Sequence, residues 1–96
     1  MVKKGFLSKE LYELILQYLA NKKMIARAEF CRTFPVFNLR TLIDEAQRGC
    51  GIEPCASTGK RVFHTPKAIL EYINRNYRIL SEEDIASGDY EPVPEN

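Results

Sequence analysis

The sequence predicts a mainly α protein that carries one small β-hairpin. Three observations support this prediction. Apolar residues recur at helical spacing in four separate segments. A serine, asparagine or threonine suited to N-capping precedes three of these segments. Between the third and fourth segments, a Gly-containing turn separates two short stretches, and the second alternates in polarity as a strand does.

The first two expected helices lie in the N-terminal third of the chain. Ser8 is a good N-cap for a helix over residues 9–21, in which Leu11, Ile15 and Leu19 recur at helical spacing. A shorter helix over residues 26–33 follows. It ends before Pro35, because proline disfavours helical dihedral angles in the residue that precedes it.

The third helix is expected over residues 39–48 and the fourth over residues 66–77. Asn38 is a plausible N-cap for the third, and Gly49 ends it. Thr65 and Pro66 form a strong start for the fourth. The predicted apolar stripe of the third helix consists of Leu39, Leu42, Ile43 and Ala46.

Two strands are expected between these helices, over residues 52–56 and 61–64. The turn Ser57-Thr58-Gly59-Lys60 joins them into a hairpin. Pro54 confines the first strand to a sheet edge, because proline has no N–H to donate. His64 ends the second strand, where we expect it at the surface or in a capping role.

The composition is that of a globular chain. Ninety-six residues suffice for one domain with one core, and 45% are apolar while 28% are charged. No run approaches the roughly 20 apolar residues that span a bilayer. Lys9, Glu10 and Glu13 interrupt the apolar part of the N-terminal segment, so we interpret it as an amphipathic helix rather than a signal peptide. We therefore expect a cytoplasmic protein without a membrane partner.

Charge is distributed unevenly along the chain. Residues 1–80 hold all 14 Lys and Arg and seven acids, whereas residues 81–96 hold the other six acids and no base. We predict a basic domain over residues 1–80, with the extra helix 9–21, and an acidic, flexible tail over residues 81–96. Ser81 and Asp84 have the spacing of a capping box, which predicts one short helical turn in the tail. A basic body favours an anionic partner.

From Ile25 to Ile73, three segments carry a resemblance to a known family. "IARAEFCRTF", "NLRTLIDEA" and "GKRVFHTPKAILEYI" resemble the DNA-binding domains of the MerR and phage excisionase group, which are winged helix-turn-helix domains. The resemblance implies that helix 39–48 enters the major groove and that the hairpin lies along a phosphate backbone or in the minor groove. Two departures stand out: Ala26 occupies a position where the family usually has Thr or Ser, and the turn "TFPVF" has no Gly.

The resemblance also implies a set of DNA-contacting residues. Basic side chains would meet phosphates and guanine, and Gln would read adenine. Asp44 and Glu45 oppose this interpretation, because carboxylates repel phosphates. Taken singly, each candidate is equally compatible with a solvated helix face or an ordinary turn, and only their joint placement favours DNA. The candidates are Arg27, Arg32, Arg40, Thr41, Gln47, Arg48, Ser57, Thr58, Lys60 and Arg61.

The cysteines do not predict a metal centre. Cys31, Cys50 and Cys55 are an odd number without a framework pattern, which favours reduced thiols. With His64 they make a poor zinc set, because there is neither a second CxxC nor a His pair. We predict no metal, no cofactor and no catalytic residue.

These observations predict a small non-enzymatic protein that binds double-stranded DNA. The resemblance points to an excisionase-like accessory factor or a transcriptional regulator of a phage or mobile element, with a second copy of the chain or a recombinase as a further partner. The alternative is a protein-binding adaptor or inhibitor on the same scaffold, whose acidic tail contacts a partner. A thiol or metal enzyme is the third and weakest interpretation.

Overall fold

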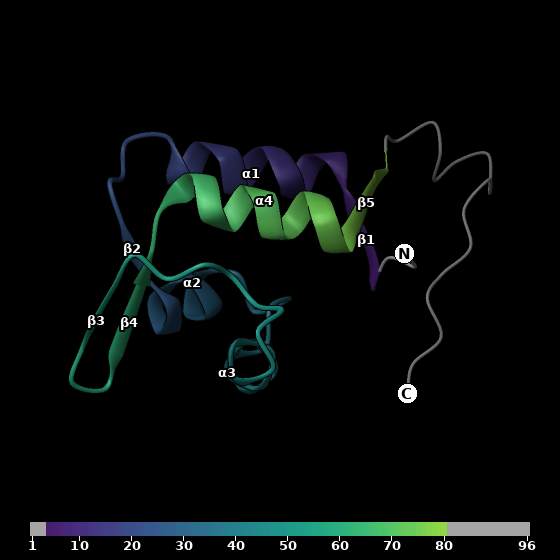
Figure 1. Ribbon diagram of the computed structural model, residues 1–96. Coiled ribbons are helices and arrows are strands. Elements are labelled where there is room, and N and C mark those ends of the chain that lie inside the picture. The colour runs from purple at the N-terminus through teal and green to yellow at the C-terminus, as the bar shows by residue number, and fades with distance from the viewer. Residues whose placement is uncertain (1–3, 81–96) are drawn as a thin grey trace. The chain divides into compact units, whose positions relative to one another are not determined.

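The computed structural model describes residues 4–80, which form four helices and five strands arranged in two small sheets (Figure 1). About 49% of these residues are helical and 22% are in strands, so this is a small α/β protein. The predicted fold class, a mainly α winged helix-turn-helix with one hairpin, is therefore wrong. The prediction missed three strands, β1 (Gly5–Ser8), β2 (Ile25–Ala26) and β5 (Tyr77–Leu80). Each is too short for a clear alternation of polarity, and each pairs with a segment remote in the sequence.

All four predicted helices are present, with slightly shorter bounds. They are α1 (Lys9–Leu19), α2 (Arg27–Thr33), α3 (Leu39–Gln47) and α4 (Pro66–Asn76). The three predicted caps form: the backbone N–H groups of Leu11, Thr41 and Ala68 donate to the side chains of Ser8, Asn38 and Thr65 over 3.1–3.2 Å. Ala26 precedes α2 and offers no side-chain cap.

By their contacts, the described residues divide into two compact units. The first comprises residues 4–20 and 73–80. In it, β1 and β5 pair in parallel, from Gly5 opposite Tyr77 to Ser8 opposite Leu80, and α1 follows β1 directly (Figure 1). Leu7, Ile15 and Leu80 are buried in this unit.

The second unit comprises residues 21–72 and contains a three-stranded antiparallel sheet in the order β2-β4-β3 (Figure 1). The predicted hairpin is there, formed by β3 (Ala56–Thr58) and β4 (Arg61–His64). Its first strand begins at Ala56 instead of residue 52, and a hydrogen bond from Cys55 N to Phe63 O extends the pairing by one step. Pro54 has no N–H with which to continue it. Gly59, at φ +59°, supplies the positive φ that the two-residue turn Gly59-Lys60 requires.

An aromatic cluster forms part of the core of the second unit. The ring centroid of Phe30 lies 5.1 Å from that of Phe37 and 5.5 Å from that of Phe34. All three residues are buried. Pro35 and Val36, between two of these rings, remain exposed in the connection from α2 to α3.

The buried face of α3 differs from the predicted stripe. Its buried residues are Leu42 and Glu45, whereas Leu39 and Ala46 are exposed and Ile43 is half-buried. The Tyr72 hydroxyl on α4 donates a 2.6 Å hydrogen bond to Glu45 Oε1, inside the second unit. This bond satisfies one oxygen of a buried carboxyl group, which apolar periodicity cannot anticipate. Glu45 is therefore not on the surface where the sequence analysis counted it against DNA binding.

Two predictions fall on residues 81–96, the acidic tail and the capped turn at Ser81. Both lie outside the described residues. Within residues 4–80, no helix has the length and apolar character needed to cross a membrane.

Candidate nucleic-acid interface

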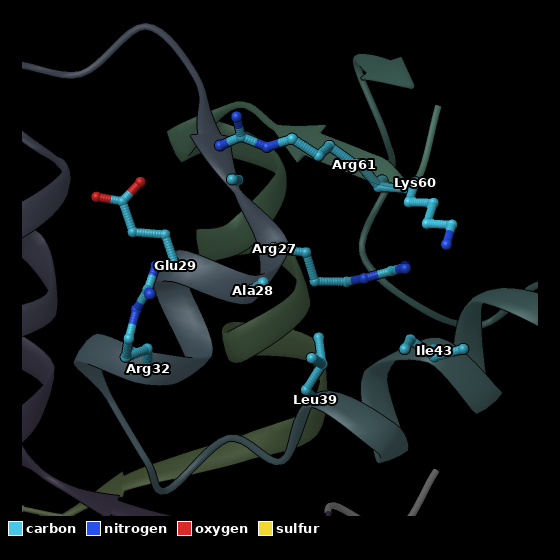
Figure 2. Close-up of a pocket in the computed structure, with 10 residues that line it drawn as sticks. Arg27, Ala28, Glu29, Arg32, Leu39, Ile43, Lys60 and Arg61 are labelled. Atoms are coloured by element: carbon cyan, nitrogen blue, oxygen red, sulfur yellow. The ribbon is translucent and has the colours of Figure 1, made fainter. Parts of the chain in front are cut away.

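A groove of about 330 Å³ lies in the second unit, where α2, α3 and the β3–β4 hairpin come together (Figure 2). Four cationic side chains line it: Arg27 and Arg32 from α2, and Lys60 and Arg61 from the hairpin. Among the described lining residues, Glu29 is the one acid. We call this feature the cationic groove. It holds a net charge of +3, contributed by two separate elements of the fold.

Arg27 occupies the centre of the cationic groove. It is the first residue of α2, directly after β2, so the pairing of β2 with β4 fixes where its side chain begins. Figure 2 shows the side chain extending between Ile43 of α3 and Lys60 of the hairpin turn. Arg27 is half-buried, whereas Arg32, Lys60 and Arg61 are exposed. A partly buried guanidinium is less screened by solvent than an exposed one, so an anion in the groove would interact more strongly with Arg27 than with the three exposed cations.

The hairpin contributes part of the lining of the cationic groove. Thr58 pairs with Arg61 across the two-residue turn, so Lys60 lies at the tip and Arg61 begins β4. The Arg61 guanidinium carbon lies 5.1 Å from the ring centroid of Phe63, a cation–π contact that restrains the side chain. A restrained guanidinium loses less conformational entropy when it binds an anion.

The other predicted site residues lie outside the cationic groove. Arg40, Thr41 and Gln47 are exposed on α3, and Arg48 is exposed at its C-cap. Ser57 lines a second cavity of about 290 Å³, and Thr58 is exposed on β3. The structure thus gathers four of the ten candidates into one groove and leaves the other six on the surface around α3 and β3.

The groove also has an apolar lining, which was not predicted from the sequence. Leu39, Ile43 and Val62 line it together with the cations. The sequence assigned Leu39 and Ile43 to the core stripe of α3, because apolar residues at i and i+4 predict a buried face. In the structure Glu45 is buried, whereas Leu39 is 37% exposed. Nothing in the sequence indicates this reversal.

His64 was predicted to lie at the surface or to act as a cap. It is buried, so the surface position is wrong. Its Nδ1 lies 2.9 Å from the carbonyl oxygen of Glu53. A carbonyl only accepts, so Nδ1 carries the proton in the neutral ring. Burial lowers the pKa of His64, the bond to Glu53 opposes that shift, and the nearby charge of Arg27 adds to it. Within residues 4–80, Nε2 has no hydrogen-bond partner.

The cysteines and acids provide no metal site in the described part of the chain. Between residues 4 and 80, no three His, Cys, Asp or Glu side chains gather closely enough to hold a metal ion. Cys50 and Cys55 are exposed, while Cys31 is buried. Burial raises the pKa of the Cys31 thiol, partly offset by Arg27, which favours the uncharged thiol over a nucleophilic thiolate.

Comparison with known proteins finds no matching family model, no matching curated protein and no matching solved structure. The resemblance to the MerR and excisionase group therefore stays a prediction.

Proposed function

We propose that this chain is a small, non-enzymatic protein that binds double-stranded DNA through the cationic groove. The observation that supports the proposal is that Arg27, Arg32, Lys60 and Arg61 line one groove, which Leu39 and Ile43 of α3 also line. On the resemblance stated above, the protein would be an excisionase-like accessory factor or a transcriptional regulator of a phage or mobile element, acting in the cytoplasm.

The charge of the groove suits a phosphate backbone. Its cations come from two elements, α2 and the hairpin, so they can contact phosphates at more than one position beside α3. A groove of about 330 Å³ is far smaller than a duplex, so the DNA would rest across its rim and direct phosphates toward the cations. Arg40 and Arg48, exposed on and after α3, would extend the contact. The burial of Glu45 supports the proposal, because it removes one of two carboxylates from the α3 surface.

The number of cations predicts how binding depends on salt. A protein that neutralises four phosphates of B-DNA has a slope of about −3.6 when log Kobs is plotted against log salt concentration. We would measure this slope by fluorescence anisotropy with a random-sequence duplex and the full chain. A variant carrying Lys60→Ala and Arg61→Ala should reduce the slope by about two and weaken binding to all sequences similarly.

A charge-matched variant controls for net charge. Lys67→Ala with Arg78→Ala removes two exposed cations that do not line the cationic groove. It should leave the slope close to that of the wild type. The absence of salt-dependent DNA binding by the wild type would refute the proposal. Equal effects of the two double variants would refute the role of the groove.

A second candidate is a protein-binding adaptor or inhibitor, in which the acidic tail contacts a partner. The concentration of six acids in residues 81–96 favours it, together with exposed apolar side chains at Met24 and Val36, which are 54% and 52% exposed. Salt screens a contact made by an acidic tail as well as DNA binding, so a variant of the tail separates the two candidates better than salt does. A variant with Glu82→Gln, Glu83→Gln and Asp84→Asn should lose a protein partner but bind DNA at least as tightly as the wild type.

A further inference from the structure

The cationic groove contains two apolar side chains that phosphate binding does not require. Leu39 and Ile43 lie one helical turn apart on α3, and both line the groove (Figure 2). The core face of α3 is formed instead by Leu42 and Glu45. Leu39, the first residue of the helix, is 37% exposed, and Ile43 is half-buried. Apolar surface is therefore presented to solvent among four cations.

The position of these side chains limits what they can contact. The resemblance stated above implies that α3 enters the major groove, and on such a helix the N-terminal residues approach the base edges. Leu39 and Ile43 occupy the first and fifth positions of α3. The C5-methyl of thymine is the apolar group that the four unmodified bases present in the major groove. A leucine or isoleucine has no donor or acceptor on its side chain, so it can recognise a base only through such a group.

We propose that Leu39 and Ile43 form an apolar contact with thymine methyl groups and give the protein a preference for A·T pairs beneath the N-terminal half of α3. The inference rests on the proposed DNA binding and assigns it a source of sequence preference. The cations fix the duplex through its phosphates, and the apolar pair selects the base. Arg27 lies between the apolar pair and the cations of the hairpin, since its side chain extends between Ile43 and Lys60 (Figure 2).

The test compares thymine with uracil, which differs from it only by the missing methyl group. The full chain first selects a high-affinity duplex from a random pool. Binding to that duplex is then compared with binding to the same duplex carrying deoxyuridine in place of every thymidine. One lost methyl contact corresponds to roughly a fourfold weaker affinity, so the wild type should bind the uracil duplex at least about fourfold more weakly.

Two variants connect the effect to α3. Leu39→Ala should discriminate less between the thymine and uracil duplexes than the wild type does, because it lacks one of the two side chains that contact the methyl groups. Leu14→Ala is the matched control: it makes the same substitution at a residue of α1 that is 50% exposed and does not line the groove. It should discriminate between the two duplexes as the wild type does.

The outcomes separate this inference from the proposed function. Salt-dependent binding that is equal for both duplexes would overturn the thymine contact and leave DNA binding in place. Discrimination that persists undiminished in both Leu39→Ala and Ile43→Ala would also overturn it. A selection that enriches no sequence with thymine would do the same. Absence of salt-dependent binding to any duplex would overturn the proposed function together with the inference.

Discussion

Replacing Tyr72 with Phe should destabilise the protein by an amount that the structure allows us to bound. The Tyr72 hydroxyl donates to Glu45 Oε1 over 2.6 Å, and both residues are only 1% exposed. Phenylalanine keeps the ring and its packing but deprives a buried carboxyl oxygen of a donor. Leaving a buried acceptor without its partner costs about 1–3 kcal/mol. At roughly 4–8 °C per kcal/mol for a domain of this size, the midpoint of thermal unfolding should fall by about 4 °C at least.

Circular dichroism melts and urea titrations would measure this loss, and Tyr12→Phe supplies the control. The Tyr12 hydroxyl lies 3.5 Å from Asn74 Oδ1 in an exposed contact. Its removal should change the free energy of unfolding by less than about 0.5 kcal/mol. Combining Tyr72→Phe with Glu45→Leu should recover part of the loss, because the buried carboxyl group that has lost the Tyr72 donor is then removed as well. A Tyr72→Phe variant as stable as Tyr12→Phe would refute the reasoning.

Three further predictions concern stability. The pKa of His64 is lowered by burial in the folded state, so the unfolded chain binds more protons near neutral pH. The urea midpoint should therefore decrease as the pH is lowered from about 7.5 to 5.5. The decrease should be smaller in His64→Gln. A pH-independent wild type would contradict this. Gly51→Ala would place a Cβ 2.9 Å from the backbone nitrogen of Ala46, and such overpacking should lower the free energy of unfolding by about 1–3 kcal/mol in the same titration. A neutral effect would show that the loop relaxes. Phe37→Ala should lower the free energy of unfolding by about 3–5 kcal/mol, because it removes a buried ring from the aromatic cluster. A melting temperature within a few degrees of the wild type would show that Phe37 does not stabilise the core in this way.

Local signals in the sequence predicted local structure. Ser8, Asn38 and Thr65 cap helices because a side-chain oxygen can satisfy a free N–H of the first turn wherever the helix is placed in the fold. The parallel pairing of β1 with β5 depends on segments about 70 residues apart, and no turn residue or spacing links them. The same limit applies to β2, two residues long, which becomes a strand because β4 lies beside it. The predicted fold class was wrong because these long-range strand pairings have no local signal in the sequence.

The candidate site was predicted in part for a related reason. The cations of the hairpin are predictable, because Gly59 specifies a turn and the residues at a turn are exposed. The orientation of α3 is not predictable from its apolar periodicity, which would bury Leu39 and Ile43. Glu45 is a core residue instead, because Tyr72 of α4 donates to its carboxyl oxygen. With Leu42 and Glu45 buried, Leu39 and Ile43 lie toward one edge of the buried face, where they line the cationic groove. We expect the bond between Glu45 and Tyr72, together with the burial of Leu42, to hold α3 in this orientation. Loss of the bond should therefore weaken the proposed thymine discrimination as well as lower the melting temperature.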